Sequence, residues 1–165
     1  MKDQSFPTAQ IALLTVSKDG PLYVISLTAP PDNRFSLPFI KAFHSALDAI
    51  ESDLKSGEPA ALITVNSNGK IYSNGLMLEN VMGIGRPYFI AYQNFLERFL
   101  TFRLPTIAAI DGLRILLSMV KSVLTLARRH AFAGGCMFAL AHDYRVMRQD
   151  KGFICMNESA LAVSF

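Results

Sequence analysis

Cysteine is scarce in this sequence, and no spacing of its residues indicates a metal site or a redox pair. The two cysteines, Cys136 and Cys155, form no CxxC pattern, and His44, His130 and His142 lack metal-ligand spacing. We therefore expect buried free thiols in a reducing compartment, structural histidines and no metal ion.

Long apolar runs and basic clusters are also missing. No window approaches the roughly 20 uninterrupted apolar residues that a transmembrane helix needs. The N-terminal sequence MKDQSFPTAQ lacks the apolar core of a signal peptide. The formal net charge is only +3, and no Lys/Arg cluster is interleaved with aromatic residues. These absences favour a soluble intracellular protein that binds neither membranes nor nucleic acid.

Apolar residues are abundant, at 51% of 165 residues against 18% charged. This length and composition indicate one domain with a sizeable core. Residues 11–16 and 22–27 are β-type runs separated by the turn signal SKDG, which predicts a hairpin. After a cap at Ser36, apolar residues keep one helical face as far as Leu54, and Gly57 ends the predicted helix.

The middle of the chain alternates strands with helices. Residues 60–65, 71–72 and 106–110 predict short strands, and the first and last are apolar enough to be buried on both faces. GIGRP at 83–87 is interpreted as a turn rather than a phosphate loop. Pro87 begins a helix with a predicted core-facing stripe, Phe89, Ile90, Phe95, Leu96, Phe99 and Leu100. This alternation predicts an α/β domain with a largely parallel sheet.

Residues 130–143, HAFAGGCMFALAHD, form the most distinctive stretch. The adjacent glycines Gly134 and Gly135 let the backbone pass close to another group. They precede apolar residues at helical spacing, so the predicted helix start has N–H groups without partners that could hold a developing negative charge. The alternative is a glycine-rich turn that only packs closely in the core.

Four motifs occur in order: SNGLML at 73–78, PTIAAIDG at 105–112, HAFAGGCMFALAHDYRVM at 130–147 and FICMNE at 153–158. Together they resemble the enoyl-CoA hydratase/isomerase (crotonase) superfamily, in particular its Δ3-Δ2-enoyl-CoA isomerase branch. The resemblance implies a single α/β domain over residues 1–165, built as a spiral of ββα units. It also implies an acyl-CoA thioester as substrate, no further cofactor, and a role in fatty-acid breakdown. Peroxisomes are the usual compartment of this branch, but the chain ends in AVSF rather than an SKL-type address, so the cytosol is the alternative.

The resemblance also implies site residues. An oxyanion hole falls on the backbone N–H groups of Leu76 and Gly134, where one donor is worth about 3 kcal/mol of barrier. Further substrate-binding positions are Ser73, Asn74, Gly75 and Gly135. Glu158 stands where the isomerases carry the carboxylate that takes a proton from C2 and returns it at C4. Hydratases carry a second glutamate at the position of Met137, so isomerisation is favoured and hydration is the alternative.

Residues 113–129, LRILLSMVKSVLTLARR, depart from the family pattern as an insert. Its polar and basic residues fall on one helical stripe, which predicts an amphipathic cationic helix. Three interpretations stay open: a surface helix covering part of the core, a membrane-surface anchor, or translated intron sequence. A smaller departure is Met77, where an aspartate is common in the family.

The second large departure is the end of the chain at Phe165, because family members continue with a further strand, helices and trimer contacts. We therefore expect a domain that is incomplete at its C-terminus and does not form the family's trimer. A catalytically inactive truncated member or isoform is accordingly an alternative to an active isomerase. Asp111 and Asp143 are expected to have turn or cap roles rather than acid roles.

Overall fold

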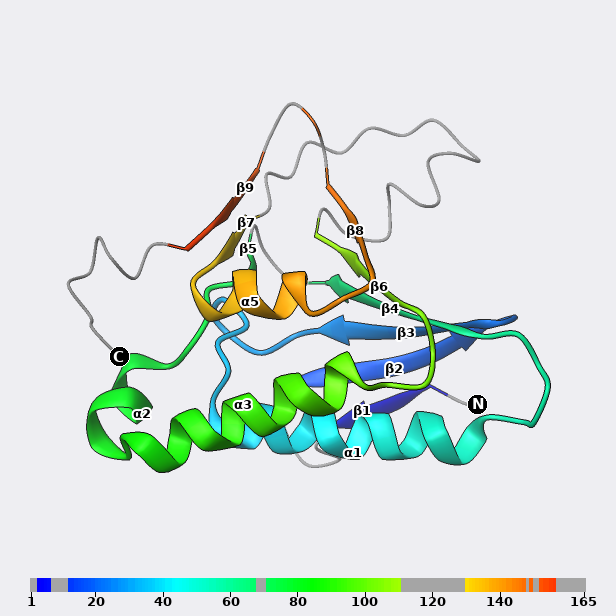
Figure 1. Ribbon diagram of the computed structural model, residues 1–165, viewed down its shortest axis with the longest axis horizontal. Helices are drawn as coiled ribbons and strands as arrows, with labels where there is room; N and C mark the ends of the chain where they lie inside the picture. Colours follow the sequence, from blue (N-terminus) through cyan, green and yellow to red (C-terminus); the bar gives the residue numbers. More distant parts are fainter. Residues whose placement is uncertain are drawn as a thin grey trace.

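The computed structural model describes residues 3–6, 12–67, 71–110, 130–147, 149 and 152–156. These residues form two sheets and four helices (Figure 1). The larger sheet has the order β1 (Gln4–Phe6), β2 (Leu14–Asp19), β3 (Leu22–Leu27), β4 (Ala61–Asn66), β6 (Thr106–Ala109), β8 (Tyr144–Val146). The smaller sheet has the order β5 (Ile71–Ser73), β7 (His130–Phe132), β9 (Phe153–Cys155). The helices are α1 (Leu37–Asp53), α2 (Leu78–Gly83), α3 (Arg86–Leu100) and α5 (Gly134–Leu140).

The strands confirm the predicted hairpin and the predicted parallel sheet. β2 and β3 pair antiparallel, whereas β3, β4, β6 and β8 pair parallel. β2 runs on to Asp19, so the turn lies one to three residues later than SKDG suggested, with Gly20 at φ +55. β1 was not predicted, because a short polar segment becomes a strand only by pairing with β2.

Helix α1 begins as predicted at Ser36, whose side-chain oxygen accepts a hydrogen bond of 3.3 Å from the Phe39 amide. Its apolar face is buried against the larger sheet and α3. Phe138 of α5 reaches into the same core, with its ring centroid 5.3 Å from that of Phe43 and 5.4 Å from that of Phe95. This aromatic cluster joins α1, α3 and α5.

The buried face of helix α3 differs from the predicted core-facing stripe. Ile90 is 45% exposed and Leu100 is 65% exposed, while two tyrosines are buried in their place. The buried residues of α3 are Tyr88, Tyr92, Phe95 and Phe99, which follow one face of the helix. Hydrophobicity alone ranks tyrosine below isoleucine and leucine, but each buried phenol here finds a backbone partner.

A buried hydrogen-bond network joins β4, β5 and the end of α5. The Thr64 hydroxyl lies 2.5 Å from the Tyr72 hydroxyl and 2.7 Å from His142 Nε2, and His142 Nδ1 lies 2.8 Å from the Phe138 carbonyl oxygen. Burial lowers the pKa of His142 to about 3, so its imidazole is neutral. Nδ1–H then donates to Phe138, and Nε2 accepts from Thr64. His142 thus has the structural role that we expected.

Asp143 joins the beginnings of β6 and β8. One of its carboxylate oxygens accepts hydrogen bonds of 2.8 Å from the amide and from the hydroxyl of Thr106, whose hydroxyl accepts from the Asp143 amide. These bonds to Thr106 lower the pKa of the Asp143 carboxyl. Asp143 therefore has the structural role predicted for it. Asp111 lies outside the described residues.

Thr64→Val tests the buried network. The substitution keeps the volume but leaves the Tyr72 hydroxyl and His142 Nε2 without their shared partner, so we expect a loss of about 1–3 kcal/mol in the free energy of unfolding. Urea unfolding measures this loss. Thr15→Val, the same change at a half-exposed position of β2, serves as control. Equal stability of the two variants would contradict the assignment.

His142 also predicts a pH dependence. An unfolded histidine has a pKa near 6.5, so between about pH 6.5 and pH 3 the unfolded chain binds a proton that folded His142 does not. The free energy of unfolding therefore decreases as the pH is lowered through this window, by up to about 1.4 kcal/mol per pH unit from this group.

The measurement is the slope of the unfolding free energy between about pH 4.5 and pH 6.5. His142→Gln is expected to flatten this slope. His44→Gln is expected to flatten it less, because His44 is half-buried and burial lowers its pKa to a smaller extent. An unchanged slope in His142→Gln would show that the buried imidazole is not the cause.

Candidate active site

The loop after β5 and the turn between β7 and α5 meet at very short range. Gly75 has φ +80, and a Cβ there would lie 2.7 Å from the Gly134 amide nitrogen. A Cβ on Gly135 would lie 2.8 Å from the carbonyl carbon of Ser73. Only glycine permits this approach without a backbone shift. The structure thus brings together the site residues that were predicted from separate motifs, Ser73, Asn74, Gly75 and Leu76 with Gly134 and Gly135.

Backbone hydrogen bonds set the direction of the Leu76 amide. The Gly75 carbonyl accepts a bond of 2.8 Å from the Phe35 amide. In a planar trans peptide, the N–H of the next residue points the opposite way. The Leu76 N–H is therefore directed away from the Phe35 segment.

The Gly134 amide is directed by the first turn of α5. The Ala133 carbonyl accepts from the amides of Cys136 and Met137, so the N–H of the same peptide group, that of Gly134, points out of the helix start. A Cβ on Gly134 would lie 3.3 Å from the Leu76 nitrogen. Neither the Leu76 nor the Gly134 amide donates a hydrogen bond to another described residue.

Ala133, which the sequence did not single out, turns the chain from β7 into α5. Its φ of 50 and ψ of −125 are rare for a residue with a side chain and cost on the order of 1–3 kcal/mol. Its amide is bound to the Cys155 carbonyl of β9 at 2.9 Å. No property of alanine signals this conformation in a sequence, because the surrounding strands impose it.

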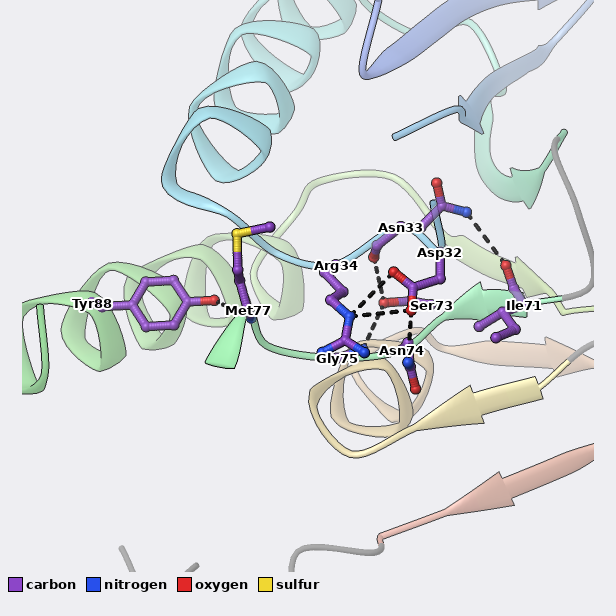
Figure 2. Close-up of polar contacts among 9 residues, drawn as sticks. All are labelled: Asp32, Asn33, Arg34, Ile71, Ser73, Asn74, Gly75, Met77 and Tyr88. Carbon is purple, nitrogen blue, oxygen red and sulfur yellow. Dashed lines mark hydrogen bonds and ion pairs between the residues drawn. The ribbon is translucent and has the colours of Figure 1, made fainter. Parts of the chain in front are cut away.

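Asp32 holds the β5 loop in place (Figure 2). Its carboxylate accepts a bond of 2.7 Å from the Asn74 side chain and is paired with the Arg34 guanidinium at 3.1 Å. The Asn74 amide donates to the Asp32 carbonyl at 3.0 Å. The side chain of Asn74 therefore contacts the scaffold of the loop.

Asn33 and Ser73 form a second set of loop contacts (Figure 2). The fully buried Ser73 hydroxyl donates to the Asn33 carbonyl at 2.7 Å and accepts from the Gly75 amide at 3.2 Å. The Asn33 side chain donates to the Tyr72 carbonyl at 3.0 Å. Ser73 thus shapes the turn from which the Leu76 amide projects.

A pocket of about 760 Å³ opens beside the two amides. Its lining residues are Leu76, Arg86, Phe89, Ile90, Tyr92, Gln93, Leu96, Gly134 and Met137. The wall is mostly apolar, and none of these described residues carries a carboxylate. Met137 therefore places a thioether in the pocket, at the position where the family resemblance puts the hydratase glutamate.

Other predicted positions contribute little or cannot be placed. Glu158 and residues 113–129 lie outside the described residues. Cys136 is buried and Cys155 is half-buried, and neither forms a disulfide within the described residues, so only Cys136 matches the predicted burial. The described part of the chain holds no group of three or more His, Cys, Asp or Glu that could bind a metal ion. None of the described helices is long and apolar enough to cross a membrane.

No protein-family model matches the chain. The fold is nevertheless shared with solved structures. One is human mitochondrial delta3-delta2-enoyl-CoA isomerase, with a TM-score of 0.72 and 25% identity over 92% of this chain and 54% of that one. Another is an enoyl-CoA hydratase/isomerase family protein from Pseudomonas syringae, with a TM-score of 0.70 and 22% identity over 93% and 58%. The chain shares the fold of the enoyl-CoA hydratase/isomerase (crotonase) superfamily and is similar in sequence to its members, which confirms the predicted resemblance and fold class.

The chain is also similar in sequence to proteins named as enoyl-CoA delta isomerases. Enoyl-CoA delta isomerase 3 of Arabidopsis thaliana is 31% identical over 88% of this chain and 56% of its own length. The peroxisomal enoyl-CoA delta isomerase 1 of the same plant is 29% identical over 88% and 54%. The mitochondrial enoyl-CoA delta isomerase 1 of Rattus norvegicus is 28% identical over 90% and 47%. The chain thus spans about half the length of these relatives, all three of which are named as enoyl-CoA delta isomerases.

Gly135→Ala tests the close approach of the two segments. The added methyl group would overlap the Ser73 carbonyl group, so we expect a loss of about 1–3 kcal/mol or more in the free energy of unfolding. Gly83→Ala is the control, because a Cβ at the end of α2 would meet nothing within 4 Å. Thermal unfolding compares the two variants. A Gly135→Ala variant as stable as the control would rule out the contact.

Proposed function

We propose that the chain binds an acyl-CoA thioester and shifts the double bond of a 3-enoyl-CoA to give the 2-enoyl-CoA. The observation that supports this most is the pair of amides, Leu76 and Gly134, which lack partners among the described residues and adjoin an apolar pocket. Relatives named as enoyl-CoA delta isomerases support the choice of reaction.

In the proposed reaction, the thioester oxygen accepts hydrogen bonds from both amides. Removal of a proton from C2 turns the thioester into a dienolate, and its negative charge collects on that oxygen. Donors that are already oriented toward the oxygen stabilise this charge more than they stabilise the neutral substrate. Return of the proton at C4 leaves the double bond conjugated with the thioester.

Glu158 is the proposed base, which takes the C2 proton and delivers it to C4. One carboxylate is sufficient, because the same proton is removed and returned. Hydration usually requires a second carboxylate to handle the added water. The pocket wall offers Met137 in the corresponding place, and a thioether neither accepts nor donates a proton at neutral pH.

The proposed step uses the thioester and the chain's own groups, without a further cofactor. A role in fatty-acid breakdown follows from the proposed reaction. Two relatives are named as peroxisomal and others as mitochondrial. We propose the peroxisome as the compartment, because two relatives, at 29% and 30% identity, are named as peroxisomal.

The test follows conjugated 2-enoyl-CoA by its ultraviolet absorbance after 3-enoyl-CoA is added to the purified chain. Glu158→Gln is expected to lower kcat by about 10²- to 10⁴-fold, because the amide cannot take the proton. Glu97→Gln, a change at an exposed position of α3, should keep wild-type turnover. A folded chain without turnover would refute the proposal, and 3-hydroxyacyl-CoA as the product would indicate hydration instead.

A further inference from the structure

Helix α3 presents two buried tyrosines, one helical turn apart, to the two segments that carry the site amides. Tyr88 is fully buried and Tyr92 is 3% exposed. Both hydroxyls bond to backbone atoms beyond their own helix. A rigid helix therefore contacts the Leu76 segment through one phenol and the Gly134 segment through the other.

Tyr88 bridges two backbone groups around Leu76. Its hydroxyl accepts a hydrogen bond of 2.8 Å from the Met77 amide, a contact drawn in Figure 2, and donates to the Phe35 carbonyl. The peptide group before Leu76 is held by the Phe35 amide through the Gly75 carbonyl. Both peptide groups that flank Leu76 are thus bound, one of them through Tyr88.

Tyr92 holds the other segment. Its hydroxyl donates to the Gly134 carbonyl oxygen at 2.5 Å, one peptide group beyond the Gly134 amide. Tyr92 is also one of the residues that line the pocket. The hydroxyl is thus bound to the backbone at the start of α5.

We propose that Tyr88 and Tyr92 are positioning residues that set the separation and direction of the Leu76 and Gly134 amides. The inference rests on the proposed function, because it takes these amides as the donors to the thioester oxygen. Each tyrosine acts through the backbone that it binds. The short β7–α5 turn and the β5 loop are far apart in the chain, and α3 is a common element that bonds to both.

Energetic considerations favour this role over simple packing. A phenylalanine would fill either position with the same ring, yet the buried hydroxyls bear the cost of leaving water and are compensated by these backbone bonds. Burial raises the pKa of Tyr88, so its phenol remains protonated and able to donate at neutral pH.

The first experiment needs no substrate. Tyr88→Phe and Tyr92→Phe each remove one oxygen atom from the full chain, and amide resonances and hydrogen exchange are recorded by NMR. We expect Tyr88→Phe to shift the Leu76 and Met77 signals and speed exchange of the Met77 amide by about 10-fold, because that amide loses its acceptor. Tyr92→Phe should shift the Gly134 and Gly135 signals.

The matched control is Tyr23→Phe, which removes a phenol hydroxyl that donates to the Asp53 carboxylate at 2.8 Å; Tyr23 lies on β3 of the larger sheet, not on α3. It is expected to change stability without moving the four amide signals. Unchanged signals in both site variants, or equal changes in Tyr23→Phe, would overturn the inference. Tyr92→Phe tests it independently if Tyr88→Phe does not fold.

The second experiment measures turnover of 3-enoyl-CoA by the same variants. Misplaced donors should lower kcat by about 5- to 10-fold in each variant with little change in KM, because positioning matters most in the transition state. Wild-type kcat in both variants would overturn the positioning role. If the variants shift the amide signals but the wild-type chain shows no turnover, the proposed function is refuted and the structural role of the tyrosines is supported.

Discussion

The close approach of two backbone segments is the constraint on which the rest of the site depends. Gly75 and Gly135 permit it, because a side chain on either would overlap backbone atoms of the opposite segment. The approach brings Leu76 and Gly134 to the wall of one pocket. Two donors can stabilise charge on a single oxygen only when both lie within hydrogen-bonding distance of it. The glycines are therefore needed because they have no Cβ, rather than because they are flexible.

The hydrophobic core orients the shorter of these segments. Helix α5 has only seven residues, too few to be stable by itself. Phe138 anchors it among aromatic rings of α1 and α3, and the neutral His142 ties its end to Thr64 of β4. The strained turn at Ala133 persists because these contacts hold both sides of it. Packing of residues outside the pocket lining thus helps to determine where the Gly134 amide points.

The pocket wall limits the chemistry that the site can support. Its described residues offer backbone donors and apolar side chains, with Arg86 and Gln93 as the polar members. In the proposed reaction, proton transfer therefore depends on a single carboxylate. One fold can support different reactions, so the proposed reaction rests on individual residues rather than on the fold.

Periodicity and capping in the sequence were sufficient to predict α1 and the buried strands, because these features depend on residues that are close in the chain. The order of the motifs could be read from the sequence directly. The sequence misjudged α3 and missed β1, since burial of Tyr88 and pairing of Gln4–Phe6 require partners from distant segments. Only the tertiary structure decided the direction of the two amides, the conformation of Ala133 and the bonds of the α3 tyrosines. The hydrogen-bond partners that set these features come from strands, helices and loops that meet only in the folded chain.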